Sequence, residues 1–175
     1  PTGWYAENLD QFSTIVVDMR AYRYRPDLVT NNQALLDYVA RGGTAVVLYQ
    51  KTFEWQSDYA PYPLRISRNR VTVEEAPVEI LQPEHPLFTT PNAIGPADWA
   101  DWVQERGLYF ADRWDDAYTP LVQMQDAGEV IPPGSWLIAQ HGDGHYIYSA
   151  LVWYRQLRAL NPGALRMFVN MLAFG

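Results

Sequence analysis

Two largely apolar, β-branched runs near the start of this 175-residue chain most constrain its fold. They are Thr14–Met19 and Thr44–Tyr49. Neither run alternates polar with apolar residues, so we expect two strands buried on both faces, as in parallel sheets. Between them, apolar residues recur at helical spacing and stop at Gly42-Gly43, which predicts a helix closed by a glycine cap. This strand–helix–strand order favours a parallel sheet with a right-handed crossover.

The segment 61–104 has a different character, because prolines interrupt it repeatedly. We interpret it as a proline-rich insertion within one domain that covers residues 1–175. Inside it, Leu64–Ile66 and Val71–Val73 are predicted to pair with each other as a hairpin about Arg68-Asn69.

The C-terminal third carries clearer local signals. Trp136–Ala139 and Tyr146–Tyr148 flank His141-Gly142-Asp143-Gly144, which predicts a hairpin with a glycine-containing turn. Asn161-Pro162 has the order of a helix cap followed by a first helical residue, so we expect the last helix to start there.

Composition excludes several classes of function. The net charge is -7 and the pI is near 4.8, so the chain lacks the basic footprint of a nucleic-acid-binding protein. There is no cysteine, and hence no disulfide, thiolate metal site or cysteine nucleophile. No apolar run reaches transmembrane length. The chain begins at Pro1 rather than Met, which leaves the compartment open, and we expect an extracytoplasmic one.

Polar side chains follow both predicted parallel strands. Arg20 and Tyr22 come after the first strand, and Gln50 and Lys51 come after the second. Because ligands bind beyond the carboxyl ends of parallel strands, we expect these four residues to line a site in which Arg20 and Lys51 hold an anion. The alternative is a structural polar network, for which the sequence offers the acidic partners Glu54, Asp58 and Glu105.

Two further groups are candidates for binding. Glu105-Arg106 precedes a predicted strand and is either part of the ligand site or a structural ion pair. An exposed cluster of Trp99, Trp102 and Trp114 is our candidate surface for a protein partner or a sugar, with ordinary packing as the alternative.

We expect neither a metal nor a cofactor. His141-x-Asp143-x-His145 has the residue types of a metal site, but its two glycines favour a turn over a rigid set of ligands, and a metal site also needs further donors and second-shell support. The sequence also lacks a phosphate-binding glycine loop and a serine nucleophile elbow.

Six blocks of sequence, in order along most of the chain, resemble one family. They are Phe12–Val17 with Arg20-Ala21-Tyr22, Gly42-Gly43-Thr44 through Tyr49-Gln50-Lys51, His85-Pro86-Leu87-Phe88, Trp102–Phe110, Trp153–Leu157, and Pro162-Gly163-Ala164. Together they resemble the C-terminal, class I glutamine amidotransferase-like domain of bacterial PIG-L/LmbE-type deacetylases. The resemblance implies a flavodoxin-like, three-layer α/β sandwich with a mainly parallel sheet, here without its first strand and helix.

The same resemblance implies that this domain sits behind a deacetylase of N-acetylated sugars. It also implies a nucleophilic cysteine after the second buried strand, where this chain has Gln50 and Lys51. Only a thiolate is strongly nucleophilic near neutral pH, so we expect no amidotransferase reaction.

We therefore expect a non-catalytic domain that docks to a deacetylase domain or a larger complex as a structural subunit. One alternative is a carbohydrate-binding or carbohydrate-processing protein associated with amino-sugar deacetylation. A third possibility is a scaffold subunit of an extracytoplasmic complex.

Overall fold

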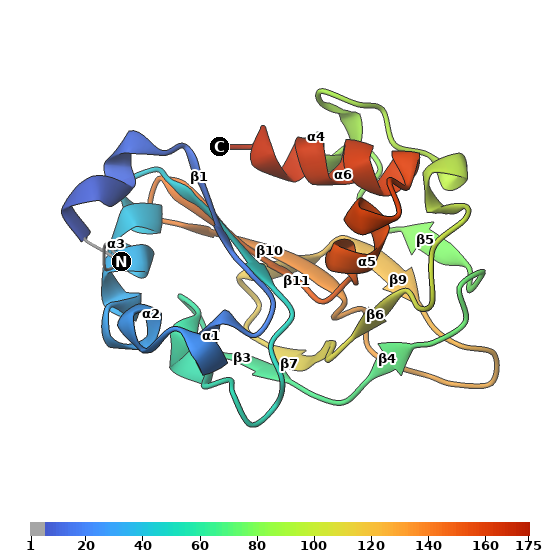
Figure 1. Cartoon of the computed structure of the whole chain (residues 1–175), viewed down its shortest axis with the longest axis horizontal. Coiled ribbons are helices and arrows are strands. Elements are labelled where there is room, and N and C mark those ends of the chain that lie inside the picture. The colour runs from blue at the N-terminus through green and yellow to red at the C-terminus, as the bar shows by residue number, and fades with distance from the viewer. Residues whose placement is uncertain (1–5) are drawn as a thin grey trace.

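The centre of the protein is a five-stranded mixed sheet, seen in a computed structural model that describes residues 6–175 (Figure 1). The strand order is β1-β2-β11-β10-β8. The strands are β1 (Thr14–Val17), β2 (Thr44–Leu48), β8 (Tyr118–Pro120), β10 (Trp136–His141) and β11 (Gly144–Ser149). β1, β2 and β11 run parallel, whereas β10 is antiparallel to both β11 and β8.

The predicted flavodoxin-like, three-layer parallel sandwich is therefore wrong. The hairpin at Gly142 returns the chain so that β11 lies beside β2, and everything beyond β11 is antiparallel. Three two-stranded antiparallel ribbons complete the β structure. They pair β3 (Leu64–Ile66) with β7 (Ala111–Trp114), β4 (Arg70–Val71) with β6 (Gly107–Leu108), and β5 (Val78–Ile80) with β9 (Val122–Met124).

The hairpin predicted within the proline-rich segment is also wrong. Each strand of residues 61–104 pairs with a strand from residues 107–124 instead. The residues between β3 and β4 are bonded to the backbone of Phe110. The Ser67 N–H donates to the Phe110 carbonyl at 2.9 Å, and the Phe110 N–H donates to the Asn69 carbonyl at 3.0 Å. These bonds keep the segment extended where a hairpin would need it to turn.

The helices surround the sheet as short segments. They are α1 (Ala21–Tyr24), α2 (Pro26–Thr30), α3 (Asn32–Ala40), α4 (Pro86–Thr89), α5 (Trp153–Arg158) and α6 (Pro162–Leu172), with 3-10 turns η1 (Ala6–Gln11), η2 (Ser57–Tyr59) and η3 (Pro96–Trp99). α3 packs on β2 and β11, while α6 packs on α4, α5 and η3 (Figure 1). In the described part of the chain, no helix combines the length and apolar character needed to cross a bilayer.

Several sequence expectations are confirmed. The β1–α3–β2 order is present, with its two strands parallel and in register from Thr14 opposite Thr44. The hairpin of β10 and β11 forms, and Gly144 is needed there because a side chain would collide with the carbonyl oxygen of Val39. α6 begins at Pro162, and the side chain of Asn161 caps it by accepting from the Ala164 N–H at 2.9 Å.

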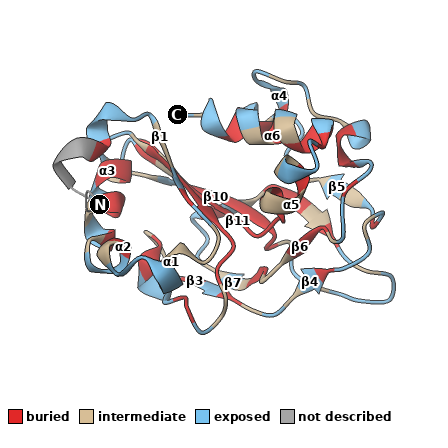
Figure 2. Cartoon of the chain, viewed as in Figure 1, coloured by how far each residue is buried: buried red, intermediate tan, exposed pale blue. Residues whose placement is uncertain are grey.

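Large aromatic side chains fill the core between the sheet and the C-terminal helices. Figure 2 shows that the central strands β10 and β11 are largely buried. Trp136 of β10 meets Trp153 of α5 with ring centroids 5.5 Å apart, and Phe88 of α4 at 5.4 Å. Tyr146 and Tyr148 of β11 are both fully buried. Their hydroxyls differ, because Tyr148 donates to the carbonyl of Tyr109 at 2.7 Å whereas that of Tyr146 has no partner among the described residues.

This difference predicts opposite effects of removing the two hydroxyls. Tyr146→Phe should leave the free energy of unfolding unchanged or raise it by up to about 1 kcal/mol, because it deletes an unpaired buried hydroxyl. Tyr148→Phe is the matched control and should lower it by about 1–2 kcal/mol. Urea unfolding of both variants measures the contrast, and a larger loss for Tyr146→Phe would contradict the assignment.

Candidate functional site

An ion pair closes the polar edge beyond β1 and β2. The Arg20 guanidinium donates to the Glu54 carboxylate, with Nη2 at 2.6 Å and Nε at 3.0 Å from Oε1. The Glu54 side chain is 1% exposed, and its hydrogen bond raises the pKa of Arg20. Arg20 adopts a left-handed backbone conformation (φ 56°), and its N–H donates to the Tyr49 carbonyl at 3.0 Å. Arg20 is thus paired with Glu54, one of the acidic partners that the structural alternative names, and Glu54 already neutralises its charge.

Gln50 is fully buried and joins the ends of the two strands. Its amide nitrogen donates to the carbonyls of Asp18 at 3.0 Å and Leu48 at 2.7 Å. Its amide oxygen accepts from the Tyr22 N–H at 3.3 Å. Every polar atom of the side chain is thus committed to the backbone, and none is left for a ligand.

The other two residues predicted for this edge are also occupied or turned away. The Tyr22 hydroxyl donates to Asn32 Oδ1 at 2.6 Å, and its ring stacks on Tyr59 with centroids 4.3 Å apart. Lys51 contacts Glu54 only through its backbone N–H, while its ammonium lies 6.0 Å from the centre of the Phe53 ring. The fold brings the four residues to one edge, as expected, but the side chains of Arg20, Tyr22 and Gln50 are already bonded there to other groups of the protein.

A tyrosine cluster at the end of β2 was missed by the sequence analysis. Tyr49 stacks on Tyr109 with centroids 5.8 Å apart and lies 6.2 Å from Tyr154, and burial raises the pKa of Tyr49 to about 12. Beside it, Glu105 forms its ion pair with Arg155 at 3.2 Å rather than with its neighbour Arg106. Tyr109 has a left-handed backbone conformation (φ 62°), which no sequence pattern indicates.

Arg106 instead supports a pocket elsewhere in the fold. It is 4% exposed, and its guanidinium donates to the Ala76 carbonyl from Nη2 at 2.9 Å and to the Trp99 carbonyl from Nη1 at 2.5 Å. The guanidinium lies over the Trp102 ring, 5.6 Å from its centre. No described carboxylate forms an ion pair with it, and burial lowers its pKa. Arg106 thus connects two opposite walls of the pocket.

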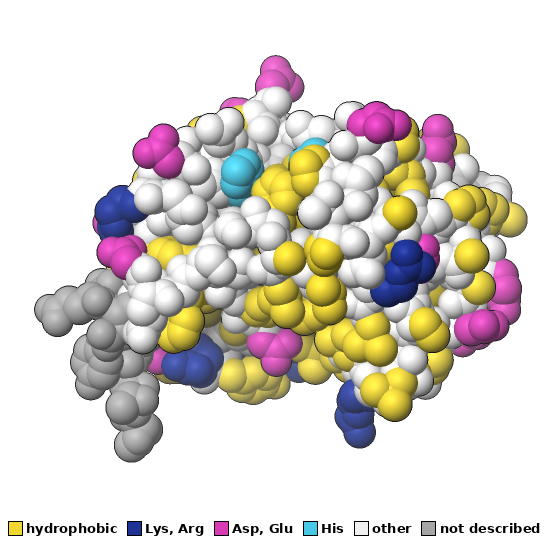
Figure 3. Space-filling view, turned by 90° about the horizontal axis from the view of Figure 1, so that it is seen from above, with side chains coloured by type: hydrophobic (Ala, Val, Ile, Leu, Met, Phe, Trp, Pro, Cys, Tyr) yellow, Lys and Arg dark blue, Asp and Glu magenta, His cyan; other side chains and the backbone are white. Residues whose placement is uncertain are grey.

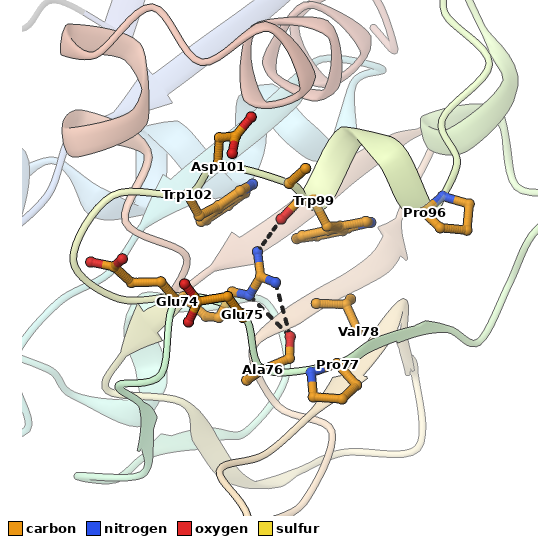
Figure 4. A pocket seen from close by; sticks show the side chains of 11 residues that line it. Glu74, Glu75, Ala76, Pro77, Val78, Pro96, Trp99, Asp101 and Trp102 are labelled. Carbon is orange, nitrogen blue, oxygen red and sulfur yellow. Dashed lines mark hydrogen bonds between the residues drawn. The ribbon is translucent and has the colours of Figure 1, made fainter.

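The pocket has a volume of about 630 Å³, within the usual range for small-molecule sites (Figure 4). Its two walls are the segment that leads into β5 and the segment that contains η3. The lining residues are Glu74, Glu75, Ala76, Pro77, Val78, Pro96, Trp99, Ala100, Asp101, Trp102 and Arg106. Figure 4 shows Glu74 and Glu75 together on one side and Asp101 beside Trp102.

Side chains from other elements hold the irregular wall of this pocket. Asp101 (φ 56°) and Gln104 (φ 70°) are both left-handed, a conformation unfavourable for residues with a side chain. Asn161 donates to the Asp101 carbonyl at 3.0 Å, and the Glu74 carboxylate accepts from the Gln104 N–H at 2.5 Å. Between them, Val103 exchanges two hydrogen bonds with the buried Gln156 amide. The wall is therefore fixed before any ligand arrives.

The predicted exposed tryptophan cluster is wrong. Trp99 and Trp102 stack on each other, with centroids 5.3 Å apart, and both are buried. Trp114 lies on β7, where it is paired with Leu64. The Trp102 ring is buried because Arg106 and Trp153 cover it. Trp99 and Trp102 therefore belong to the wall of the pocket and not to an exposed surface.

His85 and His145 both pack on the ring of Phe174, whereas His141 lies against a different ring. His141 packs edge-on against Tyr62, and His145 against Phe174. Across residues 6–175, no group of three His, Asp or Glu side chains is arranged to hold a metal ion.

Comparison with known proteins shows that this chain resembles solved structures in fold. No family model matches the chain, and no curated protein matches it. Among solved structures, the cytoplasmic protein STM3548 from Salmonella typhimurium is similar over 97% of this chain and 74% of its own, with a TM-score of 0.59 and 14% identity. The cytoplasmic protein STM1381 from Salmonella typhimurium LT2 has the same coverage and identity, with a TM-score of 0.54. At this identity the similarity concerns the fold alone.

The role of Gln50 gives a stability prediction. Gln50→Leu keeps the approximate size but leaves two carbonyls and one N–H without their partner, so it should lower the free energy of unfolding by roughly 2–4 kcal/mol. Its neighbour Lys51 provides the control, because Lys51→Met should change that value by no more than ~0.5 kcal/mol. Urea denaturation measures both, and equal stability of the two variants would show that Gln50 is not structural.

Proposed function

We propose that this chain is a non-catalytic binding domain that docks to a deacetylase domain or a larger complex. The observation that carries the proposal is the state of Gln50. The resemblance implies a nucleophilic cysteine at this point, and here an amide uses all its polar atoms to join β1 to β2. A group buried in this way reaches no substrate, and the nearby Arg20 charge is neutralised by Glu54.

The outer edge of β1 supports docking. In the described sheet β1 pairs only with β2, so its other side offers unpaired backbone groups to an added strand. Val16 is 36% exposed there, and Tyr24 and Val29 are exposed apolar residues of the adjoining α1 and α2. Val16 and Tyr24 also line a shallow pocket of about 340 Å³ along this edge.

A second apolar surface belongs to α6. Val169 and Leu172 are exposed on this helix. Figure 3 views the molecule from the α6 side and shows hydrophobic side chains gathered in the middle of the face, with charged groups scattered around them. Apolar surface surrounded by polar groups is typical of protein–protein contacts.

The pocket at Arg106 favours a second candidate function, the binding of a carbohydrate. Sugar hydroxyls donate to carboxylates, and the lining supplies Glu75 and Asp101. The apolar faces of a sugar pack on aromatic and proline side chains, which Trp99 and Pro96 provide. In this candidate the ligand lies at Arg106 and not at the closed edge near Gln50.

Docking at the β1 edge predicts sensitivity to a charge placed there. In size-exclusion chromatography the chain should co-elute with its native deacetylase domain, and Val16→Lys should abolish co-elution because a lysine blocks strand addition. Val130→Lys is the control, since Val130 is 93% exposed in the loop after β9. Hydrolysis of an amide or a glycoside by the isolated chain, lost in Glu54→Gln, would contradict a non-catalytic role.

The carbohydrate candidate predicts a change in melting temperature. A monosaccharide that binds at tenfold its Kd should raise Tm by about 3–5 °C. Ala100→Phe fills the pocket from an exposed position and should remove the shift, whereas Ala93→Phe, exposed outside the pocket, should retain it. The absence of a shift with every sugar in a panel of neutral and amino monosaccharides would reject this candidate.

A further inference from the structure

Two histidines from distant parts of the chain hold the ring of Phe174 between them. His85 precedes α4 and stacks on this ring, with centroids 5.4 Å apart and planes inclined by 26°. His145 of β11 meets the same ring edge-on, with centroids 4.8 Å apart. All three side chains are half-buried. Because Phe174 follows α6, the two imidazoles attach the residues after this helix to α4 and to the central sheet.

The His85 side chain also caps the start of α4. Its Nδ1 accepts from the Leu87 N–H at 3.2 Å. An imidazole nitrogen accepts a hydrogen bond only when it carries no proton, so this bond requires a neutral His85 with its proton on Nε2. The Leu87 carbonyl is held separately, because Asn170 of α6 donates to it at 2.9 Å. The first turn of α4 therefore depends on the charge of His85, whereas the attachment of α4 to α6 does not.

The surroundings of both imidazoles favour the neutral form. Burial lowers the pKa of His145 from its usual value of 6.5, and burial together with the charge of His145 lowers the pKa of His85. Across the sheet, His145 lies between Gln140 and Thr44, which carry no charge. Since each pKa is lower in the folded chain than in the unfolded one, the resulting stability is complete above about pH 6.5 and is lost as the pH falls below it.

No counter-ion holds either histidine in its charged form. The nearest carboxylates along the chain are those of Glu84, of Asp143 in the turn before β11, and of Gly175 at the end of this chain. α4 contains no charged residue, and Arg166, the charged residue of α6, is paired elsewhere. Among residues 6–175, no carboxylate forms an ion pair with an imidazole.

A cation–π contact with Phe174 opposes these effects. A protonated imidazole over the ring is attracted by its π face. This attraction does not replace the bond from Leu87, and a second protonated imidazole at the same ring adds like-charge repulsion. Protonation of both histidines therefore favours their separation toward water.

We propose that His85 and His145 form a pH-sensitive clamp on Phe174, which is closed when both imidazoles are neutral and opens when they are protonated. Opening frees the Leu87 N–H and releases the residues after α6, while Asn170 keeps α4 on α6. Figure 3 shows histidine side chains on the same face as the hydrophobic group of α6, so opening changes the border of that surface. The clamp goes beyond the proposed function, because it acts whether or not a partner or a sugar binds.

Amide hydrogen exchange of the whole chain tests the clamp without a substitution. Between about pH 7.5 and about pH 5, the range in which histidine changes charge, the protection factor of the Leu87 N–H should fall roughly fivefold or more. The NMR signals of the Phe174 ring should move toward those of an unstructured peptide over the same range. The amides of β2, which is buried throughout, should keep their protection.

Three variants separate the clamp from other effects of acid. His85→Asn keeps an N-cap acceptor that does not titrate, so Leu87 should stay protected at about pH 5. His141→Asn is the matched control and should lose protection at Leu87 as the unchanged chain does, because His141 lies against Tyr62 instead. His145→Gln removes a like charge and should raise the pKa of His85, measured by NMR titration of the imidazole signals.

Four results would overturn the proposal. Leu87 protection that does not change with pH would show that the cap bond survives acid. An equal loss of protection in His85→Asn would place the titrating group elsewhere, and an unchanged pKa of His85 in His145→Gln would show that the two imidazoles are not coupled. Loss of protection in β2 as large as that at Leu87 would mean that the whole chain unfolds in acid and that no local clamp opens.

Discussion

The position of β11 between β2 and β10 is the constraint on which the rest of the structure depends. β11 is parallel to β2, with Val46 opposite Ile147, and antiparallel to β10, with Ile138 opposite Ile147. It thereby joins the parallel and antiparallel parts of the sheet. The chain that leaves β11 bonds at once to the segment around Arg106, since the Val152 N–H donates to the Arg106 carbonyl at 3.2 Å. The central strand therefore also positions the pocket.

The pocket wall itself is stabilised by side chains rather than by regular structure. Asn161, Gln156 and Glu74 bond to backbone groups of residues 100–104, and Arg106 bonds to the carbonyls of both walls. These partners come from separate elements, so the pocket exists only when the surrounding fold is complete. Buried polar networks of this kind give a segment one defined shape when all members are satisfied. The same network explains how two left-handed residues persist in one short loop.

Local patterns predicted the elements whose stabilising contacts are close in sequence. β1, α3 and β2 were predicted from hydrophobic runs, the β10–β11 turn from its glycines, and the start of α6 from Asn161-Pro162. Patterns failed where pairing was distant. β3 and β4 have the composition of a hairpin, yet each pairs with a strand some forty residues away, because the segment between them bonds to Phe110. The sequence analysis also predicted too many parallel strands, because the order and direction of strands in a sheet depend on long-range contacts.

The sequence by itself determined that no thiol is present, that two early strands are buried, and that acidic groups outnumber basic ones. These properties follow from residue type and local periodicity. Only the tertiary structure decided that the Gln50 amide bonds to backbone groups between β1 and β2. Only the tertiary structure decided that Arg106 bonds both to Trp99 and to Ala76, which lies 30 residues before Arg106 in the chain. The physical reason is that a hydrogen bond or a ring contact depends on distance in space, and neither residue type nor spacing along the chain encodes which distant groups the fold brings within reach.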